Sequence, residues 1–322
     1  RIANQIMQEF ARNLTGFGEL PEGAGERSYE HVEHRPTVAI VGAGPAGRAA
    51  AHELAAAGVD HLLLDRHDRR QLEAPLGDDE RGPLPEATLC DAGVFAIYPG
   101  PRLEFPDGAD DPALLAASEI ADEGLRERLH SVRPRHLLLA TGSRDPMLPF
   151  ANNDLPGIVA ARGLIRALHR AQARIAGRCV VVGEGDWAER QQAILDGLRS
   201  EGAPKVELVA PGEIERAVGR DRIEGLECRG GRISCALLAV AARPAPAHEL
   251  AAQAGVALRF DGTGFAVVRD DAGACGRLGG TRLWAAGDLC GWVGNHAAAR
   301  DGARVARSII ASLGPSPQEI RP

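Results

Sequence analysis

The sequence has few aromatic residues and no long apolar run. Aromatic side chains make up 4% of its 322 residues, so the core must be built mainly from Ala, Leu, Val and Ile. That composition suits helices packed on parallel sheets, and the length is enough for two domains. No apolar run reaches the roughly 20 residues that cross a bilayer, so we predict no membrane span. No secretory signal peptide is recognisable, so we expect a cytoplasmic protein.

Closely spaced cysteines and excess positive charge are also missing. None of the six cysteines forms a CxxC pair, which excludes dithiol chemistry of the CxxC type and disfavours structural zinc or an iron–sulfur cluster. We therefore expect reduced, scattered thiols and no metal site. The formal net charge of −7 argues against a nucleic-acid partner held by phosphate contacts.

The most informative stretch present is an apolar strand, Thr37–Val41, that runs into the turn Gly42-Ala43-Gly44-Pro45-Ala46-Gly47. An Ala-rich helix follows, and then a second strand that ends at Asp65. Glycines at these spacings allow a tight turn, close approach of a pyrophosphate and close packing of helix on strand. The helix N-terminus offers free N–H groups to phosphates, and Asp65 can accept a hydrogen bond from a ribose hydroxyl. The pattern predicts a β-α-β unit that binds the ADP half of a dinucleotide.

Three further pieces follow in order along the chain. A buried strand ends in Ala140-Thr141-Gly142, a second glycine turn with its strand and helix lies at Gly183 and Gly185, and a strand at 283–286 ends in Gly287-Asp288. Strands are also predicted near 87–90, 94–98, 102–105, 206–210 and 235–244, and helices over 2–14 and 295–313.

The order of these four pieces resembles that of the two-dinucleotide-binding-domain flavoproteins, the glutathione-reductase-like superfamily. Within it, residues 140–146, residues 150–158 and the arm Phe17–Pro21 are similar to the α subunits of heterotetrameric sarcosine oxidase. They are equally similar to relatives in opine oxidase, hydrogen cyanide synthase and dye-linked proline dehydrogenase.

The resemblance implies an α/β fold: an FAD/NAD(P)-binding Rossmann-like domain of three ββα layers with a second Rossmann-like domain inserted. The expected divisions are an N-terminal helix and arm at 1–35, an FAD-binding domain at 36–151 and 246–313, an inserted NAD(P)-binding-like domain at 152–245, and a tail at 314–322.

The cofactor implied by the resemblance is FAD, with NAD or another adenine nucleotide in its place as the alternative. The glycine turn would hold the pyrophosphate, Asp65 the adenosine ribose, and Asp288 the ribityl chain. The complete predicted site consists of Gly42, Gly44, Pro45, Ala46, Gly47, Asp65, Arg66, Thr141, Gly142, Gly287 and Asp288. Arg48 is interpreted either as a further phosphate ligand or as a surface residue, and Trp292 either as a neighbour of the cofactor ring or as packing.

Two departures from the family pattern bear on function. The connection after Asp65 has no Gly-Gly turn and carries many charges, which favours the alternative nucleotides for the first site. In the second turn, Glu184 and Asp186 flank Gly183 and Gly185 and would repel a pyrophosphate, so NAD(P)H binding there is disfavoured.

The function that we predict is an FAD-dependent oxidoreductase, the electron-transfer subunit of an amine or imino-acid oxidase or dehydrogenase complex of sarcosine or opine type. Its expected partner is a β-type amine-oxidising flavoprotein subunit. The alternatives are a non-catalytic scaffold subunit that holds a dinucleotide, and a standalone NAD(P)H-dependent flavin reductase. No Ser-His-Asp or Cys-His arrangement is recognisable in the sequence, so no catalytic acid or base is predicted. This agrees with hydride transfer, in which the cofactor carries the chemistry.

Overall fold

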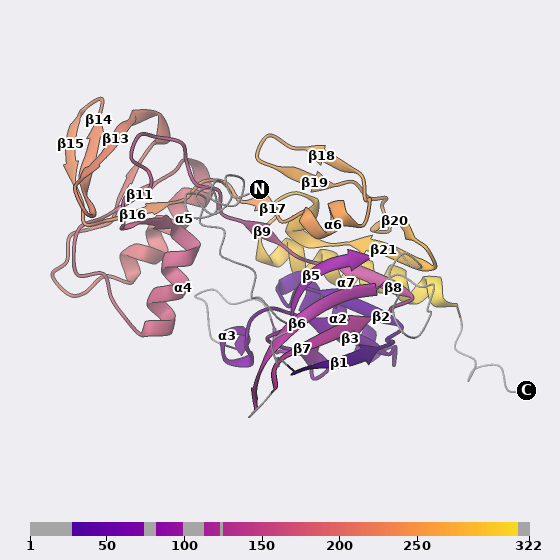
Figure 1. Cartoon of the computed structure of the whole chain (residues 1–322). Helices are drawn as coiled ribbons and strands as arrows, with labels where there is room; N and C mark the ends of the chain where they lie inside the picture. The colour runs from indigo at the N-terminus through magenta and orange to yellow at the C-terminus, as the bar shows by residue number, and fades with distance from the viewer. Residues whose placement is uncertain (1–27, 74–81, 99–112, 123–124, 315–322) are drawn as a thin grey trace, which may run out of the picture.

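The chain folds into two lobes, each built on its own parallel sheet (Figure 1). This computed structural model describes residues 28–73, 82–98, 113–122 and 125–314. The predicted helix over 2–14, the strand at 102–105 and the tail from 315 lie outside those residues.

The central sheet of the first lobe has the order β20-β21-β8-β2-β3-β4. All neighbouring strands pair in parallel except β20, which runs antiparallel to β21 at one edge. Its strands are β2 (Val38–Val41), β3 (His61–Leu64), β4 (Thr88–Leu89), β8 (His136–Leu139), β20 (Ala274–Leu278) and β21 (Thr281–Ala285). Every residue of β2 and β8 is buried, as expected for parallel strands covered on both faces.

Two helices cover one face of this sheet, α2 (Pro45–Ala56) and α7 (Asn295–Leu313). Ile40, Leu138 and Trp284 of the sheet pack against them in one buried cluster. The helices approach each other closely, because a β-carbon on Gly302 of α7 would lie 2.0 Å from the carbonyl oxygen of Ala46. Helix α7 has the bounds that the sequence predicts.

A second sheet, of order β1-β7-β6-β5, covers the opposite face. Its strands are β1 (Ser28–His34), β5 (Gly93–Tyr98), β6 (Ala113–Asp122) and β7 (Leu125–Val132). Strands β6 and β7 are not predicted from the sequence, and the end of the predicted arm is a strand, β1, that pairs in parallel with β7. The first lobe therefore has the three ββα layers that the resemblance implies.

The second lobe repeats this arrangement on a smaller scale. Its parallel sheet has the order β10-β16-β11-β12, with helices α4 (Ala161–Ala171) and α5 (Gly185–Gly197) packed in one core cluster. An antiparallel sheet packs in a second cluster with Val180 and Val182. The strands are β10 (Ile158–Ala160), β11 (Cys179–Val182), β12 (Glu207–Val209), β13 (Ile214–Gly219), β14 (Ile223–Cys228), β15 (Gly231–Ser234) and β16 (Leu237–Val240).

Two short antiparallel strands connect the lobes, β9 (Ser143–Arg144) and β17 (Ala245–Pro246) (Figure 1). The remaining elements are α3 (Arg69–Glu73), α6 (Glu249–Gln253), the hairpin β18 (Leu258–Phe260) and β19 (Phe265–Val267), and the 3-10 turns η1 (Pro211–Glu213) and η2 (Gly287–Cys290).

Candidate functional site

The predicted site residues gather where β2, β8 and β21 end side by side. Val41 pairs with Leu139, and Leu139 pairs with Ala285, so the three strands finish in register. The chain turns out of these strands at Gly42, Ala140 and Ala286, which places the three predicted motifs along one carboxyl edge of the sheet. Ligands of open α/β sheets bind at such an edge.

The glycine turn after β2 is closely packed at one glycine and open at another. Gly42 adopts a φ of +107°, and a β-carbon there would lie 2.3 Å from the carbonyl oxygen of Ala140. Around Gly44, by contrast, no protein atom lies within 4 Å of the place that a β-carbon would take. Gly44 is also the N-cap of α2 and makes no side-chain cap hydrogen bond, so no capping side chain satisfies the N–H groups of the first turn. Pro45 occupies the first turn of the helix, where its missing N–H has no cost.

Asp65 closes the turn from the side of β3. One oxygen of its carboxylate accepts a hydrogen bond from the N–H of Ala43 at 2.7 Å, and the other accepts from the N–H of His67 at 2.9 Å. The His67 ring also lies 2.7 Å from that second oxygen. Burial alone would raise the pKa of Asp65, but the hydrogen bonds from His67 and Ala43 lower it overall. The group is therefore an anion with acceptor capacity left for ribose hydroxyls.

Arg48 differs from both sequence interpretations, because it is neither a surface residue nor turned toward a ligand. Only 2% of it is exposed, and its guanidinium donates to three carbonyl oxygens. The acceptors are Ala43 in the glycine turn at 2.9 Å, Leu72 of α3 at 2.5 Å and Gly82 at 2.8 Å. Arg48 thus ties the glycine turn to both described ends of the connection after Asp65. The charged side chains of α3 itself, Arg69, Arg70 and Glu73, are exposed.

The Gly287-Asp288 turn meets the glycine turn across the sheet edge. Gly287 has a φ of +73°, and a β-carbon there would lie 2.9 Å from that of Ala46. Its N–H donates to Asp301 of α7 at 2.8 Å, and Asp301 is also paired with Arg269 and Arg304. Burial would raise the pKa of Asp301, but hydrogen bonds from Arg269, Gly287 and Arg304 lower it. A buried anion on α7 therefore fixes the turn that carries Asp288.

The Asp288 carboxylate is held from two sides. One oxygen accepts the N–H groups of Val293 and Gly294, at 2.9 and 3.1 Å, and the other accepts the Ser143 hydroxyl at 3.2 Å. Thr141 and Gly142 lie between the two turns. The Thr141 hydroxyl donates to the Ala247 carbonyl at 2.7 Å, and Gly142, with a φ of +72°, has an open side.

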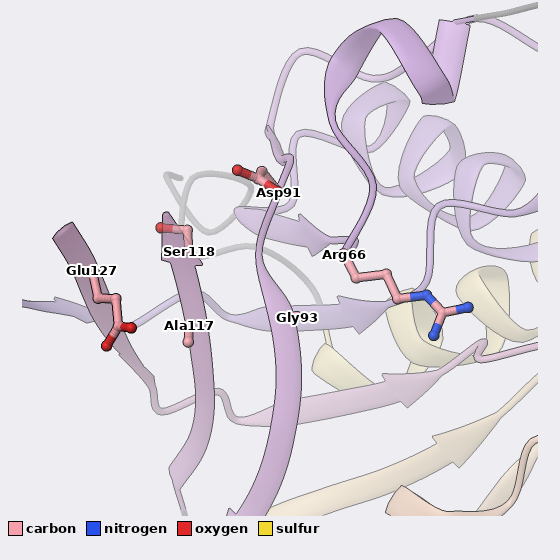
Figure 2. A pocket seen from close by; sticks show the side chains of 6 residues that line it. All are labelled: Arg66, Asp91, Gly93, Ala117, Ser118 and Glu127. Atoms are coloured by element: carbon pink, nitrogen blue, oxygen red, sulfur yellow. The ribbon is translucent and has the colours of Figure 1, made fainter. Parts of the chain in front are cut away.

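An open pocket of about 310 Å³ lies between Arg66, the segment 91–93 and strands β6 and β7 of the outer sheet (Figure 2). It is lined by Arg66, Asp91, Gly93, Ala117, Ser118 and Glu127. In Figure 2 the Arg66 side chain extends away from Asp91, Ser118 and Glu127. The side of the pocket opposite Arg66 is therefore bordered by acidic and hydroxyl groups. The sequence patterns do not identify this pocket, because β6 and β7 are brought over Arg66 only by the folded sheet.

The second glycine turn has a similar backbone but a different surface. A β-carbon on Gly183 would lie 2.6 Å from the Ala241 carbonyl, and Gly185 has a φ of +71°. Glu184 and Asp186 are both exposed beside the start of α5. Their charges therefore stand where a pyrophosphate would approach.

Other redox or acid–base chemistry has little support among the described residues. Burial raises the pKa of Cys179, Cys275 and Cys290 to about 12 each, so these thiols stay protonated near neutral pH. In the parts of the chain that the structure describes, no three His, Cys, Asp or Glu side chains gather so as to hold a metal ion. No helix within those parts is long and apolar enough to cross a membrane.

Comparison with known proteins gives the cofactor class. A family model of an FAD binding domain matches residues 35–74, the segment that holds the glycine turn, Asp65 and α3. The sarcosine oxidase subunit alpha of Corynebacterium sp. (strain P-1) is 31% identical over 186 residues, which are 52% of this chain and 19% of that protein. The hydrogen cyanide synthase subunit HcnB of Pseudomonas aeruginosa is 35% identical over 163 residues, 45% of this chain and 33% of that one. The chain thus spans well under two thirds of these relatives.

Solved structures agree on the fold. The L-proline dehydrogenase of P. horikoshii superposes with a TM-score of 0.67 at 19% identity, over 90% of this chain and 58% of that one. The thioredoxin reductase of T. acidophilum gives a TM-score of 0.60 at 15% identity, over 87% and 99%. These findings confirm the predicted fold class and FAD as the predicted cofactor. Residues 35–74 therefore match an FAD binding domain, and the chain has the fold of the L-proline dehydrogenase and the thioredoxin reductase named above.

Proposed function

We propose that the chain is the electron-transfer subunit of a complex that oxidises amines or imino acids. The observation that carries the proposal is the contrast between the two glycine turns. The turn at Gly42–Gly47 is open beside Gly44 and is joined to an anionic Asp65, whereas the turn at Gly183 presents Glu184 and Asp186 to any phosphate. This contrast supports nucleotide binding at the first turn and disfavours it at the second, so we propose a protein partner rather than NAD(P)H as the electron source.

The proposed site assigns a role to each predicted residue. The N–H groups at the start of α2 bind the pyrophosphate, Asp65 binds the adenosine ribose, and Asp288 binds the ribityl chain. Thr141 and Gly142 form the floor between them, Gly47 and Ala46 keep α2 close to its neighbours, and Arg66 borders the adenosine end. When bound, FAD supplies hydride and single-electron chemistry; the residues named here hold and orient it. The boundaries predicted for the two domains belong to the same proposal.

The partner that we propose is a β-type flavoprotein subunit that oxidises the amine. Support comes from the relatives, which are named as subunits of sarcosine oxidase and of hydrogen cyanide synthase, and from the fold shared with L-proline dehydrogenase. The complex would work in the cytoplasm. The substrate would be a small secondary or primary amine, bound by the partner.

The first test is a visible absorption spectrum of the purified chain, followed by identification of any nucleotide that it releases on denaturation. We expect a flavin spectrum and released FAD. The flavin should be bleached anaerobically by sarcosine or proline only when the amine-oxidising subunit is present, and hardly at all by NADH or NADPH. Fast bleaching by NADPH would identify a reductase instead. A colourless chain that releases NAD or another adenine nucleotide would identify a scaffold.

A further inference from the structure

We propose that Arg162 is a positioning residue: it clamps the second lobe onto the first and orients Asp288 through Ser143. Arg162 lies in the first turn of α4, in the second lobe, whereas Ser143 and Asp145 lie on and just after β9, the strand that leaves the first lobe. The part of the proposal that treats Asp288 as a cofactor ligand rests on the proposed function. The clamp between the two lobes does not depend on the proposed function.

The guanidinium of Arg162 makes a set of directed contacts across this junction. Its Nε donates to Asp145 at 2.6 Å, one terminal nitrogen donates to the Ser143 hydroxyl at 3.3 Å, and the other donates to the Ser143 carbonyl at 3.1 Å. Arg162 and Asp145 are only 22% and 13% exposed, so water screens their ion pair weakly. A planar fork of this kind fixes direction as well as distance, which a lysine does not do.

The Ser143 hydroxyl passes this constraint to Asp288. It accepts from Arg162 and donates its only hydrogen to the Asp288 carboxylate at 3.2 Å. Because Arg162 occupies the acceptor side of the hydroxyl, the hydrogen is directed toward Asp288. The rotamer of Asp288 is therefore set from the second lobe as well as from its own loop.

A pair of tryptophans makes a second bridge between the same two regions. Trp187 on α5 meets Trp292, in the loop after η2, edge to face with 5.2 Å between ring centroids. Arg162 lies over the Trp187 ring at 5.6 Å, so the cation joins the aromatic pair to the ion pair. The loop that carries Trp292 is in turn held by Asp288, which accepts the N–H groups of Val293 and Gly294.

Both bridges therefore end at Asp288, one through Ser143 and one through the loop. A rotation of the second lobe about β9 and β17 would separate Trp187 from Trp292 and pull Arg162 from Ser143. A change in the orientation of the second lobe would therefore also change the position of the Asp288 carboxylate. In this chain the second glycine turn serves as a contact surface, because Trp187, at the start of its helix, is used to touch the first lobe.

The test measures the two bridges separately in the full chain. The variants are Arg162→Ala, Arg162→Lys, Ser143→Ala and Trp187→Phe, and the control is Arg216→Ala, which removes an exposed ion pair with Glu227 in the same lobe. Near-ultraviolet circular dichroism of the FAD-free chain reports the tryptophan pair, and titration with FAD reports the affinity of the site.

We expect Arg162→Ala to lose the same dichroism signal as Trp187→Phe and to weaken FAD binding about tenfold, since a charge-assisted contact is worth roughly that factor. Arg162→Lys should restore part of the dichroism signal and part of the FAD affinity. Ser143→Ala should weaken FAD binding but keep the dichroism signal, and Arg216→Ala should change neither.

An unchanged dichroism spectrum in Arg162→Ala would overturn the clamp. A changed spectrum with unchanged FAD affinity in Arg162→Ala and Ser143→Ala would overturn the positioning of Asp288. If the parent chain binds no FAD, the proposed function fails, and the dichroism of the FAD-free variants still decides whether the clamp exists.

Discussion

A β-carbon on Gly47 would lie 1.8 Å from the carbonyl oxygen of Gly42, so these two glycines are in backbone contact where α2 leaves β2. Real β-carbon contacts never come this close, and the obstacle is backbone that cannot rotate away. Gly44, between them, has no such neighbour. The same motif thus contains one glycine needed by the fold and one whose open side is left for a ligand.

Alanine substitutions should separate these two roles. Gly47→Ala should destabilise the chain by about 3 kcal/mol or more, because the helix must move off the strand. Gly44→Ala should unfold at the temperature of the parent, since its φ of −75° suits any residue, yet bind FAD at least tenfold more weakly. Thermal unfolding of the FAD-free chain and an FAD titration measure the two effects. A stable Gly47→Ala chain would contradict the packing argument.

Asp65→Asn should weaken FAD binding by about ten- to a hundredfold, because an amide replaces an anionic acceptor of ribose hydroxyls. The loss should persist at mildly acidic pH and shrink only below the ordinary range of an aspartate pKa, because the hydrogen bonds to Asp65 lower the pKa of its carboxyl group. Asp60, which accepts the N–H of Thr37 at the other end of the sheet, gives the matched control Asp60→Asn. Equal affinities in the Asp65 variant and the control would remove Asp65 from the site.

Sequence patterns located most of the site because its parts lie at strand ends. The predicted strands at 37–41, 136–139 and 283–286 are short, mainly apolar and followed by small residues, and each coincides with a strand of the central sheet, β2, β8 or β21. The outer strands β6 and β7 were missed, since their alternation is irregular; they pair with each other as a hairpin, but β7 pairs on its other side with β1, which is distant in sequence. The packing of Trp187 on Trp292 could not be predicted for the same reason: nothing local links the two residues.

The burial of Arg48 is the clearest feature that sequence patterns do not predict. A charged residue in the first turn of a helix is ordinarily exposed, and its burial here depends on carbonyl groups from Leu72 and Gly82. Those partners come from a connection that has no regular hydrophobic periodicity, so no pattern in the sequence predicts them.

Arg48→Met should therefore be among the most damaging single changes in the first lobe. It leaves three carbonyl oxygens without their donor, and we expect a loss of about 3 kcal/mol in the free energy of unfolding. Arg48→Lys should recover only part, because an ammonium cannot reach three acceptors in a fork. The control is Arg307→Ala, which removes an exposed pair with Glu53 between α7 and α2 and should cost under about 1 kcal/mol. Similar urea midpoints for Arg48→Met and Arg307→Ala would contradict this account.

His130 should make the stability of the outer sheet depend on pH. Burial, with help from His34 and Arg128, lowers the pKa of His130 from 6.5 to about 4. The unfolded chain then binds the proton more tightly than the folded one, so stability is full above pH 6.5 and falls as the pH drops toward 4. We expect a loss of about 1 to 2 kcal/mol across that window, allowing for partial screening.

Urea unfolding at several pH values measures this effect. His130→Gln should flatten the dependence, whereas His52→Gln, at an exposed position on α2, should leave it as it is. A dependence that persists in His130→Gln would assign the effect to another group.

The two strands that join the lobes run antiparallel and exchange hydrogen bonds, with Ala245 opposite Arg144 and Pro246 opposite Ser143. The inserted segment consequently leaves and re-enters the first lobe at one place, the paired strands β9 and β17. It interrupts no strand of the central sheet. During folding, β21 can pair with β8 only once the whole insert between them has been spanned, so this pairing is a long-range contact that we expect to form slowly. Replacing the inserted segment with a short turn between β9 and β17 would bring β8 and β21 closer in sequence, and this slow, long-range step would become a more local one.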